Sequence, residues 1–125
     1  MKNILVILLA ALLPSWALGQ AASTPETETV TAIAQCMVEG APEGWQRLYM
    51  VVELAEPGAE SGEVRYLAER NGEERQAYIP CDARRPARLL IAARKQQPPE
   101  RSGWTGARLV IHPDGKFQLN YDYPK

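Results

Sequence analysis

The sequence predicts an α+β fold in which an antiparallel β-sheet carries two helices on one face, with the element order α-β-β-β-α-β-β. Three observations support this prediction. Apolar residues repeat at helical spacing between residues 30 and 38. The stretch from Trp45 to Leu54 alternates with a period of two. Two turn sequences, Asn71-Gly72 and His112 to Gly115, each separate short alternating runs.

The N-terminus has the pattern of a removable signal peptide over residues 1–19. Lys2 precedes the ten apolar residues Ile4 to Leu13, and the small residues Ala17 and Gly19 form a cleavage site. This run is too short to span a membrane, which takes roughly 20 residues, although an uncleaved anchor is the alternative. We expect residues 20–125 to form a single domain, periplasmic or secreted, with no stable membrane anchor after cleavage.

Both cysteines, Cys36 and Cys81, lie in this domain. A lone pair of cysteines in an oxidising compartment most simply forms a disulfide, and we expect one between them. Two buried free thiols, or one reactive thiol, are the alternatives. Because no third cysteine or nearby histidine accompanies them, the pair does not have the pattern of a metal site or of Cys-His catalysis.

The first helix is predicted from residue 23 to residue 40. Ser23 and Glu26 have the spacing of a capping box, and Pro25 is tolerated in the first turn. Gly40, with Pro42 after it, marks the predicted C-terminal end of this helix. The expected apolar stripe consists of Val30, Ile33, Ala34, Met37 and Val38.

The next strand should turn four side chains toward the core: Leu48, Met50, Val52 and Leu54. A two-residue turn at Asn71-Gly72 would then pair Tyr66 with Ala77 and Val64 with Ile79. The four paired residues would share the buried face, since their pattern agrees with that register.

A second helix is predicted after Cys81, with Asp82 as its cap and Pro86 in its first turn. Its apolar side would consist of Ala87, Leu90 and Ile91, and its arginines should face water. In the final hairpin, Pro113-Asp114 suits a type I turn and Gly115 supplies a positive φ. The expected pairs are Ile111 with Phe117, Leu109 with Leu119, and Ala107 with Tyr121, all on the buried face.

Charge and composition argue against several kinds of site. Without Lys2 the chain has 13 basic and 15 acidic residues, so it lacks the basic excess typical of nucleic-acid binding. The acids crowd residues 53–74 and the basic residues follow at 84–108, which indicates either solvated faces or an electrostatic docking patch. The lone His112 lies in a turn, and no serine has a neighbouring histidine. We therefore predict no catalytic residue, no metal site and no cofactor, with a carboxylate-pair hydrolase as the enzymatic alternative.

Four residues are candidates for contact with a partner. Tyr49 and Trp104 fall off the aliphatic faces of their strands, where aromatic residues bracketed by charge are typical of interface anchors. Packing under the second helix is the alternative for both. Asp122, between Tyr121 and Tyr123, is either a recognition residue or an outward position on an edge strand. We include Tyr123 with it as a candidate.

Three segments resemble a known family. Pro42 to Tyr49 and Gly62 to Tyr66 resemble the opening strands of the YezG-like immunity proteins, and Trp104 to Tyr123 resembles the ending of that family. Its most specific part is Gly115-Lys116-Phe117 followed by Tyr121-Asp122-Tyr123. The resemblance covers nearly the whole domain.

This resemblance implies a small α+β antitoxin that binds a bacterial toxin and has neither enzymatic activity nor a cofactor. The chain departs from the family in its signal peptide and its two cysteines. We therefore expect a periplasmic immunity protein that neutralises a cognate protein toxin stoichiometrically. A small periplasmic ligand-binding protein or an envelope protein is the alternative.

Overall fold

The computed structural model describes residues 24–125. The predicted signal peptide and Ser23 lie outside the described residues. Helix α1 (Pro25–Glu39) is followed by strands β1 (Trp45–Leu54), β2 (Gly62–Arg70) and β3 (Gln76–Ala77). Helix α2 (Arg85–Ala93) leads through the 3-10 turns η1 (Arg94–Gln96) and η2 (Pro99–Arg101) to β4 (Gly106–Ile111) and β5 (Phe117–Asp122).

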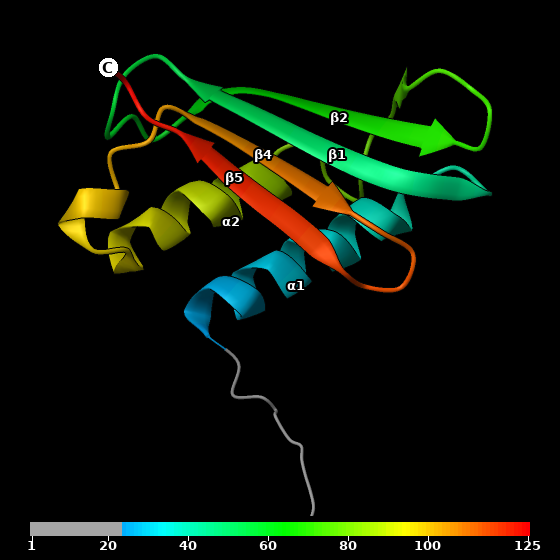
Figure 1. The fold of residues 1–125 in the computed structure, drawn as a ribbon, viewed down its shortest axis with the longest axis horizontal. Helices are drawn as coiled ribbons and strands as arrows, with labels where there is room; N and C mark the ends of the chain where they lie inside the picture. The colour runs from blue at the N-terminus through cyan, green and yellow to red at the C-terminus, as the bar shows by residue number, and fades with distance from the viewer. Residues whose placement is uncertain (1–23) are drawn as a thin grey trace, which may run out of the picture.

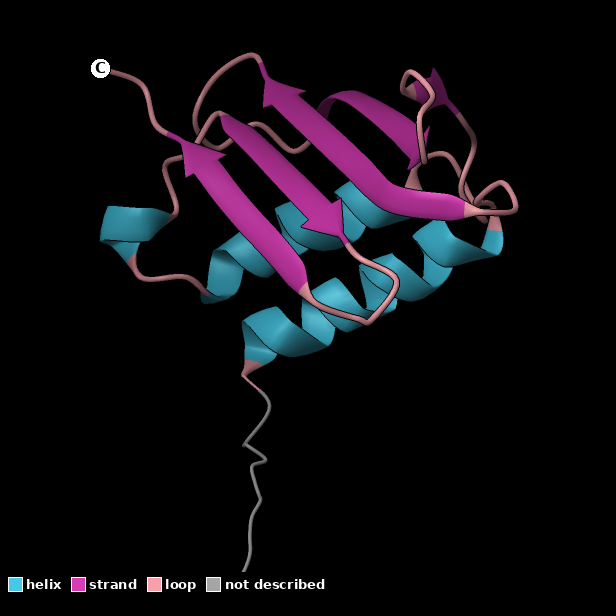
Figure 2. Cartoon of the chain, turned by 45° about the vertical axis from the view of Figure 1, so that its right-hand side comes forward, coloured by secondary structure: helices cyan, strands magenta, loops and turns pink. Residues whose placement is uncertain are grey.

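The strands form one antiparallel sheet in the order β3-β2-β1-β4-β5 (Figure 1). Both helices lie on the same side of this sheet, as Figure 2 shows, so no helix of residues 24–125 lies on its other face. The predicted α+β fold class is confirmed. Among the described residues, no helix is long and apolar enough to cross a membrane.

The core lies between the sheet and the two helices. Strand β1 contributes all four predicted side chains, each less than a tenth exposed: Leu48, Met50, Val52 and Leu54. Strands β2 and β4 add Tyr66, Ala68, Ala107, Leu109 and Ile111. The alternation of the sequence therefore predicts correctly which face of the central strands is buried.

Helix α1 begins one residue later than the capping-box pattern predicts. Its N-cap is Thr24, whose Oγ1 accepts a hydrogen bond from the N–H of Thr27 at 3.0 Å. The residues that α1 buries are Val30, Ile33, Cys36 and Met37. Val38, at the edge of the predicted stripe, is 43% exposed, so the buried stripe is narrower than the pattern indicates.

The register of the β2–β3 hairpin differs by one residue from the prediction. Leu67 pairs with Ala77, whereas the sequence predicted Tyr66 opposite Ala77 and Val64 opposite Ile79. A shift of one residue moves every side chain of a strand to the other face of the sheet. As a consequence Ile79 is 72% exposed instead of buried.

The loop of this hairpin explains the difference. Gly72 has a positive φ of 76°, and the N–H of Glu73 donates to the carbonyl of Arg70. Pairing resumes only at Gln76, so the loop is longer than the two residues that Asn-Gly suggests. Tyr78 then faces the core, where its hydroxyl donates to the carbonyl of Met37 at 3.0 Å.

The predicted disulfide between Cys36 and Cys81 is present. It joins α1 to the segment before α2, and the N–H of Cys81 also donates to the carbonyl of Cys36 at 2.8 Å. This contact depends on Gly40, because a Cβ there would overlap the carbonyl oxygen of Ile79. A disulfide persists in an oxidising, extracytoplasmic environment, and it indicates such an environment for this domain.

Pro86 lies in the first turn of α2 as predicted, but the N-cap position is Arg84, two residues after the predicted cap Asp82, and the Arg84 side chain makes no capping hydrogen bond. Oδ1 of Asp82 accepts hydrogen bonds from the N–H groups of Arg84 at 2.8 Å and Arg85 at 3.0 Å. The expected side chains are buried: Ala87, Leu90 and Ile91. The prediction that the arginines of this region face water is wrong for Arg94, which is only 8% exposed because it continues the buried side of the helix.

The β4–β5 hairpin has the predicted register in full. Ile111 pairs with Phe117, Leu109 with Leu119, and Ala107 with Tyr121. Gly115 has a φ of 91°, and its N–H donates to the carbonyl of His112 at 3.0 Å.

Candidate functional site

The helix-free face of the sheet, here called the open face, arranges side chains in three rows that cross the strands. The aromatic row consists of Leu67, Tyr49, Val110 and Gln118. The basic row consists of Arg65, Val51, Arg108 and Asn120. The acidic row consists of Glu63, Glu53, Gly106 and Asp122. Antiparallel pairing places these residues opposite one another, so each row joins four strands.

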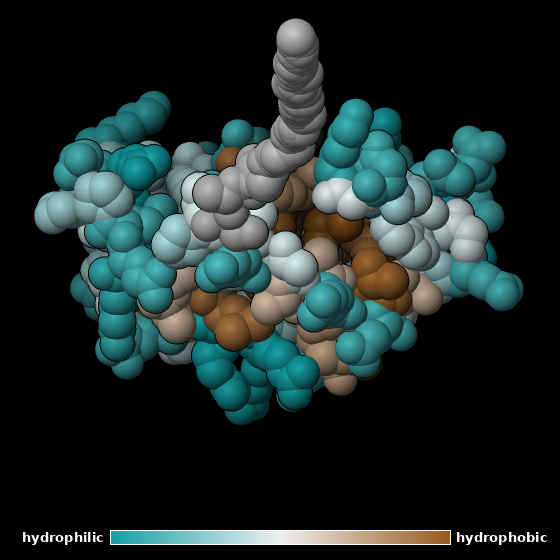
Figure 3. Space-filling view, turned by 90° about the horizontal axis from the view of Figure 1, so that it is seen from below, coloured by the Kyte–Doolittle hydropathy of each residue, from teal (hydrophilic) through white to brown (hydrophobic). Residues whose placement is uncertain are grey.

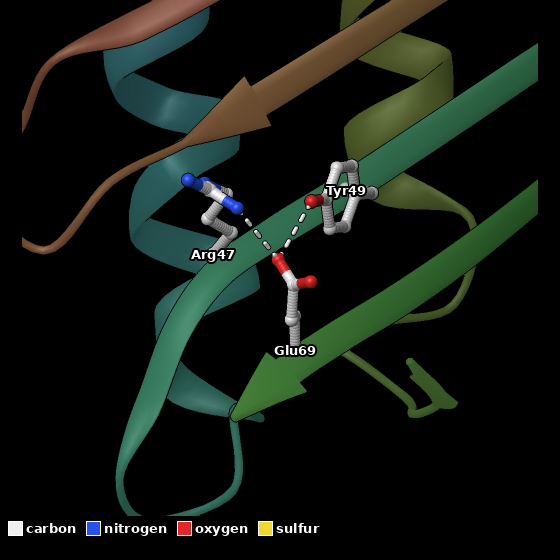
Figure 4. Close-up of polar contacts among 3 residues, drawn as sticks. All are labelled: Arg47, Tyr49 and Glu69. Carbon is white, nitrogen blue, oxygen red and sulfur yellow. Dashed lines mark hydrogen bonds and ion pairs between the residues drawn. The ribbon is translucent and has the colours of Figure 1, made fainter. Parts of the chain in front are cut away.

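Tyr49 is the centre of the aromatic row and is only 6% exposed, although no helix covers it. The guanidinium of Arg75 lies over its ring, 4.1 Å from the centroid. Its hydroxyl donates to Oε1 of Glu69 at 2.9 Å, and Nη1 of Arg47 donates to the same oxygen at 3.0 Å (Figure 4). The ring is therefore held by a cation–π contact and by a shared carboxylate.

The carboxylate of Glu69 is electrostatically tuned by this cluster. The hydrogen bond from Tyr49 and, next, the hydrogen bond from Arg47 stabilise its ionised form and hold the pKa of Glu69 below its ordinary value. The Arg47–Glu69 ion pair is partly exposed, so it contributes to the local arrangement more than to stability.

The charges of the other two rows have no ion-pair partner within residues 24–125. The ion pairs there join Arg47 to Glu69, Arg70 to Glu73, and Lys116 to Asp114. None includes the exposed arginines and acids of the basic and acidic rows: Arg65, Arg108, Glu53, Glu63 and Asp122. Exposed charges without an ion-pair partner among the described residues are available to a partner protein.

The acidic row places like charges side by side. Glu53 lies directly opposite Glu63, and Gly106 separates Glu53 from Asp122. The carboxylate of Asp122 lies over Gly106, where a Cβ would come within 3.0 Å of Oδ2. Like charges directly across a strand pair are destabilising, so positive charge from outside would relieve this row.

Of the four candidate contact residues, the structure places Tyr49 and Asp122 on the open face. Asp122 is exposed, whereas the surface of Tyr49 is largely covered by Arg75. Tyr123 is 45% exposed just beyond β5, and its hydroxyl donates to the carbonyl of Arg101 at 3.1 Å.

Trp104 is not at the surface. It is fully buried, its Nε1 donates to Oε1 of Gln97 at 3.0 Å, and its ring centroid lies 5.1 Å from that of Tyr121. The prediction of Trp104 as an exposed anchor is therefore wrong. The structure corresponds to the alternative in which the ring packs within the molecule, beside the segment that follows α2.

Arg94 is the second residue that contacts the Trp104 ring. Its guanidinium lies 5.7 Å from the centroid of the Trp104 ring, and Nη1 has no hydrogen-bond partner among the described residues. A buried guanidinium nitrogen without a partner is energetically unfavourable, and the cation–π contact offsets only part of that cost.

Sequence reasoning missed Arg47, Glu69 and Arg75. The position of Arg47 and Glu69 on the open face could have been predicted, because strand alternation places both opposite the core. No sequence pattern predicts the position of Arg75, since it lies in the irregular segment between β2 and β3. Within residues 24–125 no group of three or more His, Cys, Asp and Glu side chains could hold a metal ion.

The helix side of the molecule carries apolar and polar side chains together. Seen from below, its apolar residues gather in small areas among polar side chains (Figure 3).

Comparison of the chain with models of known families and with curated proteins gives no match in either case.

Proposed function

We propose that the protein is a periplasmic immunity protein that binds a bacterial toxin through its open face and neutralises it stoichiometrically. The observation that carries this proposal is the set of charges around Tyr49 that have no ion-pair partner within residues 24–125, on a sheet face that none of the described helices covers. The resemblance of the strands to YezG-like immunity proteins supports the same function.

The open face has the properties that recognition of a charged protein requires. Unpaired arginines and carboxylates in separate rows allow a partner of opposite pattern to align in one orientation. Tyr49 lies beside these rows but is only 6% exposed, with Arg75 over its ring, so the charged rows rather than Tyr49 would make most of the contacts with a partner.

The disulfide supports the location. A toxin that acts on the cell wall or on the membrane is accessible to an inhibitor in the periplasm, and the Cys36–Cys81 bond would keep the inhibitor folded there.

The first experiment is a pull-down from periplasm with the disulfide-bonded protein as bait, identified by mass spectrometry. Charge reversal by Arg108→Glu in the basic row should weaken capture about tenfold or more. Arg88→Glu is the matched control, since Arg88 is an exposed arginine on α2, on the opposite side of the sheet.

Equal capture by the Arg108→Glu and Arg88→Glu proteins would show that the toxin binds elsewhere. A bait that captures no stoichiometric protein at all would contradict the immunity function and favour a ligand-binding or envelope role.

A further inference from the structure

The two edges of the sheet are built differently. Strand β3 is only two residues long and is soon followed by Pro80, so it offers little backbone for pairing. Strand β5 runs for six residues from Phe117 to Asp122 with no proline and no basic residue inside it. Soluble proteins usually protect long edges with prolines, charges or bulges, and this edge has almost none of these devices.

The hydrogen-bond pattern identifies the backbone groups of β5 that have no strand partner within residues 24–125. The N–H of His112 donates to the carbonyl of Lys116 at 2.9 Å, and in an antiparallel pair such bonding alternates along the strand. The N–H and C=O groups of Phe117, Leu119 and Tyr121 therefore point away from β4, toward open solvent.

The side chains of the same three residues are also incompletely covered. Phe117, Leu119 and Tyr121 face the helix side, yet each is only half-buried. Beside Phe117 a groove of about 590 Å³ opens between the β4–β5 hairpin and α1, where Ala34 and Val38 line it. The edge thus combines free backbone with apolar surface beneath it.

We propose that β5 is a dimerisation edge, on which a second copy of the chain pairs its own β5 in antiparallel orientation to form a ten-stranded sheet. Pairing about a twofold axis at Leu119 places Leu119 opposite itself and Phe117 opposite Tyr121 of the second copy. The half-buried apolar side chains of both edges then cover one another.

Charge complementarity selects this register. With Leu119 at the axis, Lys116 lies opposite Asp122 of the second copy, and symmetry creates this pair twice. Both residues are exposed, and the side chain of Lys116 is 84% accessible. An axis at Asn120 would place Asp122 opposite Gln118, and Lys116, whose Nζ lies 4.0 Å from Oδ2 of Asp114 in its own chain, would face no acid of the second copy. In either register the open faces of the two copies remain uncovered.

The test measures the molar mass of the disulfide-bonded protein by sedimentation velocity over a wide range of protein concentration. We expect a reversible monomer–dimer equilibrium. Lys116→Asp or Asp122→Lys alone should weaken the dimer roughly tenfold, because each creates two like-charge pairs. The double variant Lys116→Asp/Asp122→Lys should restore it, which a general effect on folding would not produce.

Leu119→Pro is a second variant, since it removes an N–H that points away from β4 and should abolish the dimer while circular dichroism stays unchanged. A monomer at every concentration would overturn the proposal. So would a dimer that neither the charge reversals nor Leu119→Pro weakens. A monomer whose edge instead captures a foreign toxin, with capture lost in Leu119→Pro, would assign β5 to a partner strand and likewise overturn it.

Discussion

Tyr49 shows how an aromatic residue can be buried on a sheet face that carries no helix. Strand alternation places it correctly opposite the core, but the guanidinium that lies over its ring belongs to Arg75, which is in an irregular segment. A side chain that is covered by a loop residue has no periodic signal in the sequence. The face of Tyr49 could therefore be predicted, whereas its environment could not.

The Tyr49–Glu69 hydrogen bond should make stability depend on pH. A carboxylate whose folded pKa is depressed stabilises the fold above its unfolded pKa, about 4.3, and loses that stabilisation as pH falls through the folded value. Tyr49→Phe should consequently lower the free energy of unfolding at pH 7 more than at low pH. Urea denaturation at both pH values measures the difference.

Tyr123→Phe is the control for this prediction, because the hydroxyl of Tyr123 donates to a backbone carbonyl that does not titrate. An equal loss for Tyr49→Phe at both pH values would show that the Glu69 carboxylate contributes nothing to the effect.

A hydrophobic substitution of Arg94 should stabilise the fold. Arg94→Met keeps the length of the side chain and removes a buried nitrogen that has no hydrogen-bond partner among the described residues. We expect the free energy of unfolding to rise by about 1 to 3 kcal/mol, measured by chemical denaturation. A loss of that size instead would show that the contact with Trp104 outweighs the unpaired nitrogen.

At the scale of elements, the register of one hairpin depends only on its turn residues, whereas the register of the other also depends on distant contacts. The β4–β5 register follows from His112 to Gly115 alone, so the sequence predicts it completely. The β2–β3 register also depends on Tyr78, which bonds to Met37, and on Cys81, which bonds to Cys36. Such contacts with a distant helix cannot be inferred from the turn residues.

Gly40 tests how closely the segment before α2 approaches α1. Gly40→Ala should destabilise the fold by about 1 to 3 kcal/mol, because the added Cβ meets backbone atoms of Ile79 and Pro80 that cannot move freely. Gly103→Ala is the matched control, since nothing lies within 4 Å of a Cβ there. Thermal denaturation of both variants measures the effect, and equal melting temperatures would contradict the predicted contact.

At the scale of the whole molecule, the disulfide connects the first helix to the second half of the chain across 45 residues of sequence. Replacing both cysteines, in Cys36→Ala/Cys81→Ala, should lower the free energy of unfolding by about 4 kcal/mol, the loop-entropy value for a loop of this length. Reductant should lower the stability of the original protein to a similar extent and leave the variant unchanged. A reductant effect on the variant would show that another group is responsible.

Along β1, β2, β4 and β5, alternate residues have two different roles: one set packs in the core and the other lies on the open face. Residues that point toward the helices make the core, and most of their neighbours on the open face are exposed. Selection can therefore change the surface without changing the fold. A library randomised at Arg65, Arg108, Glu53 and Asn120 should yield mostly folded members, so lineages of this protein can acquire new partners by substitution at a few strand positions.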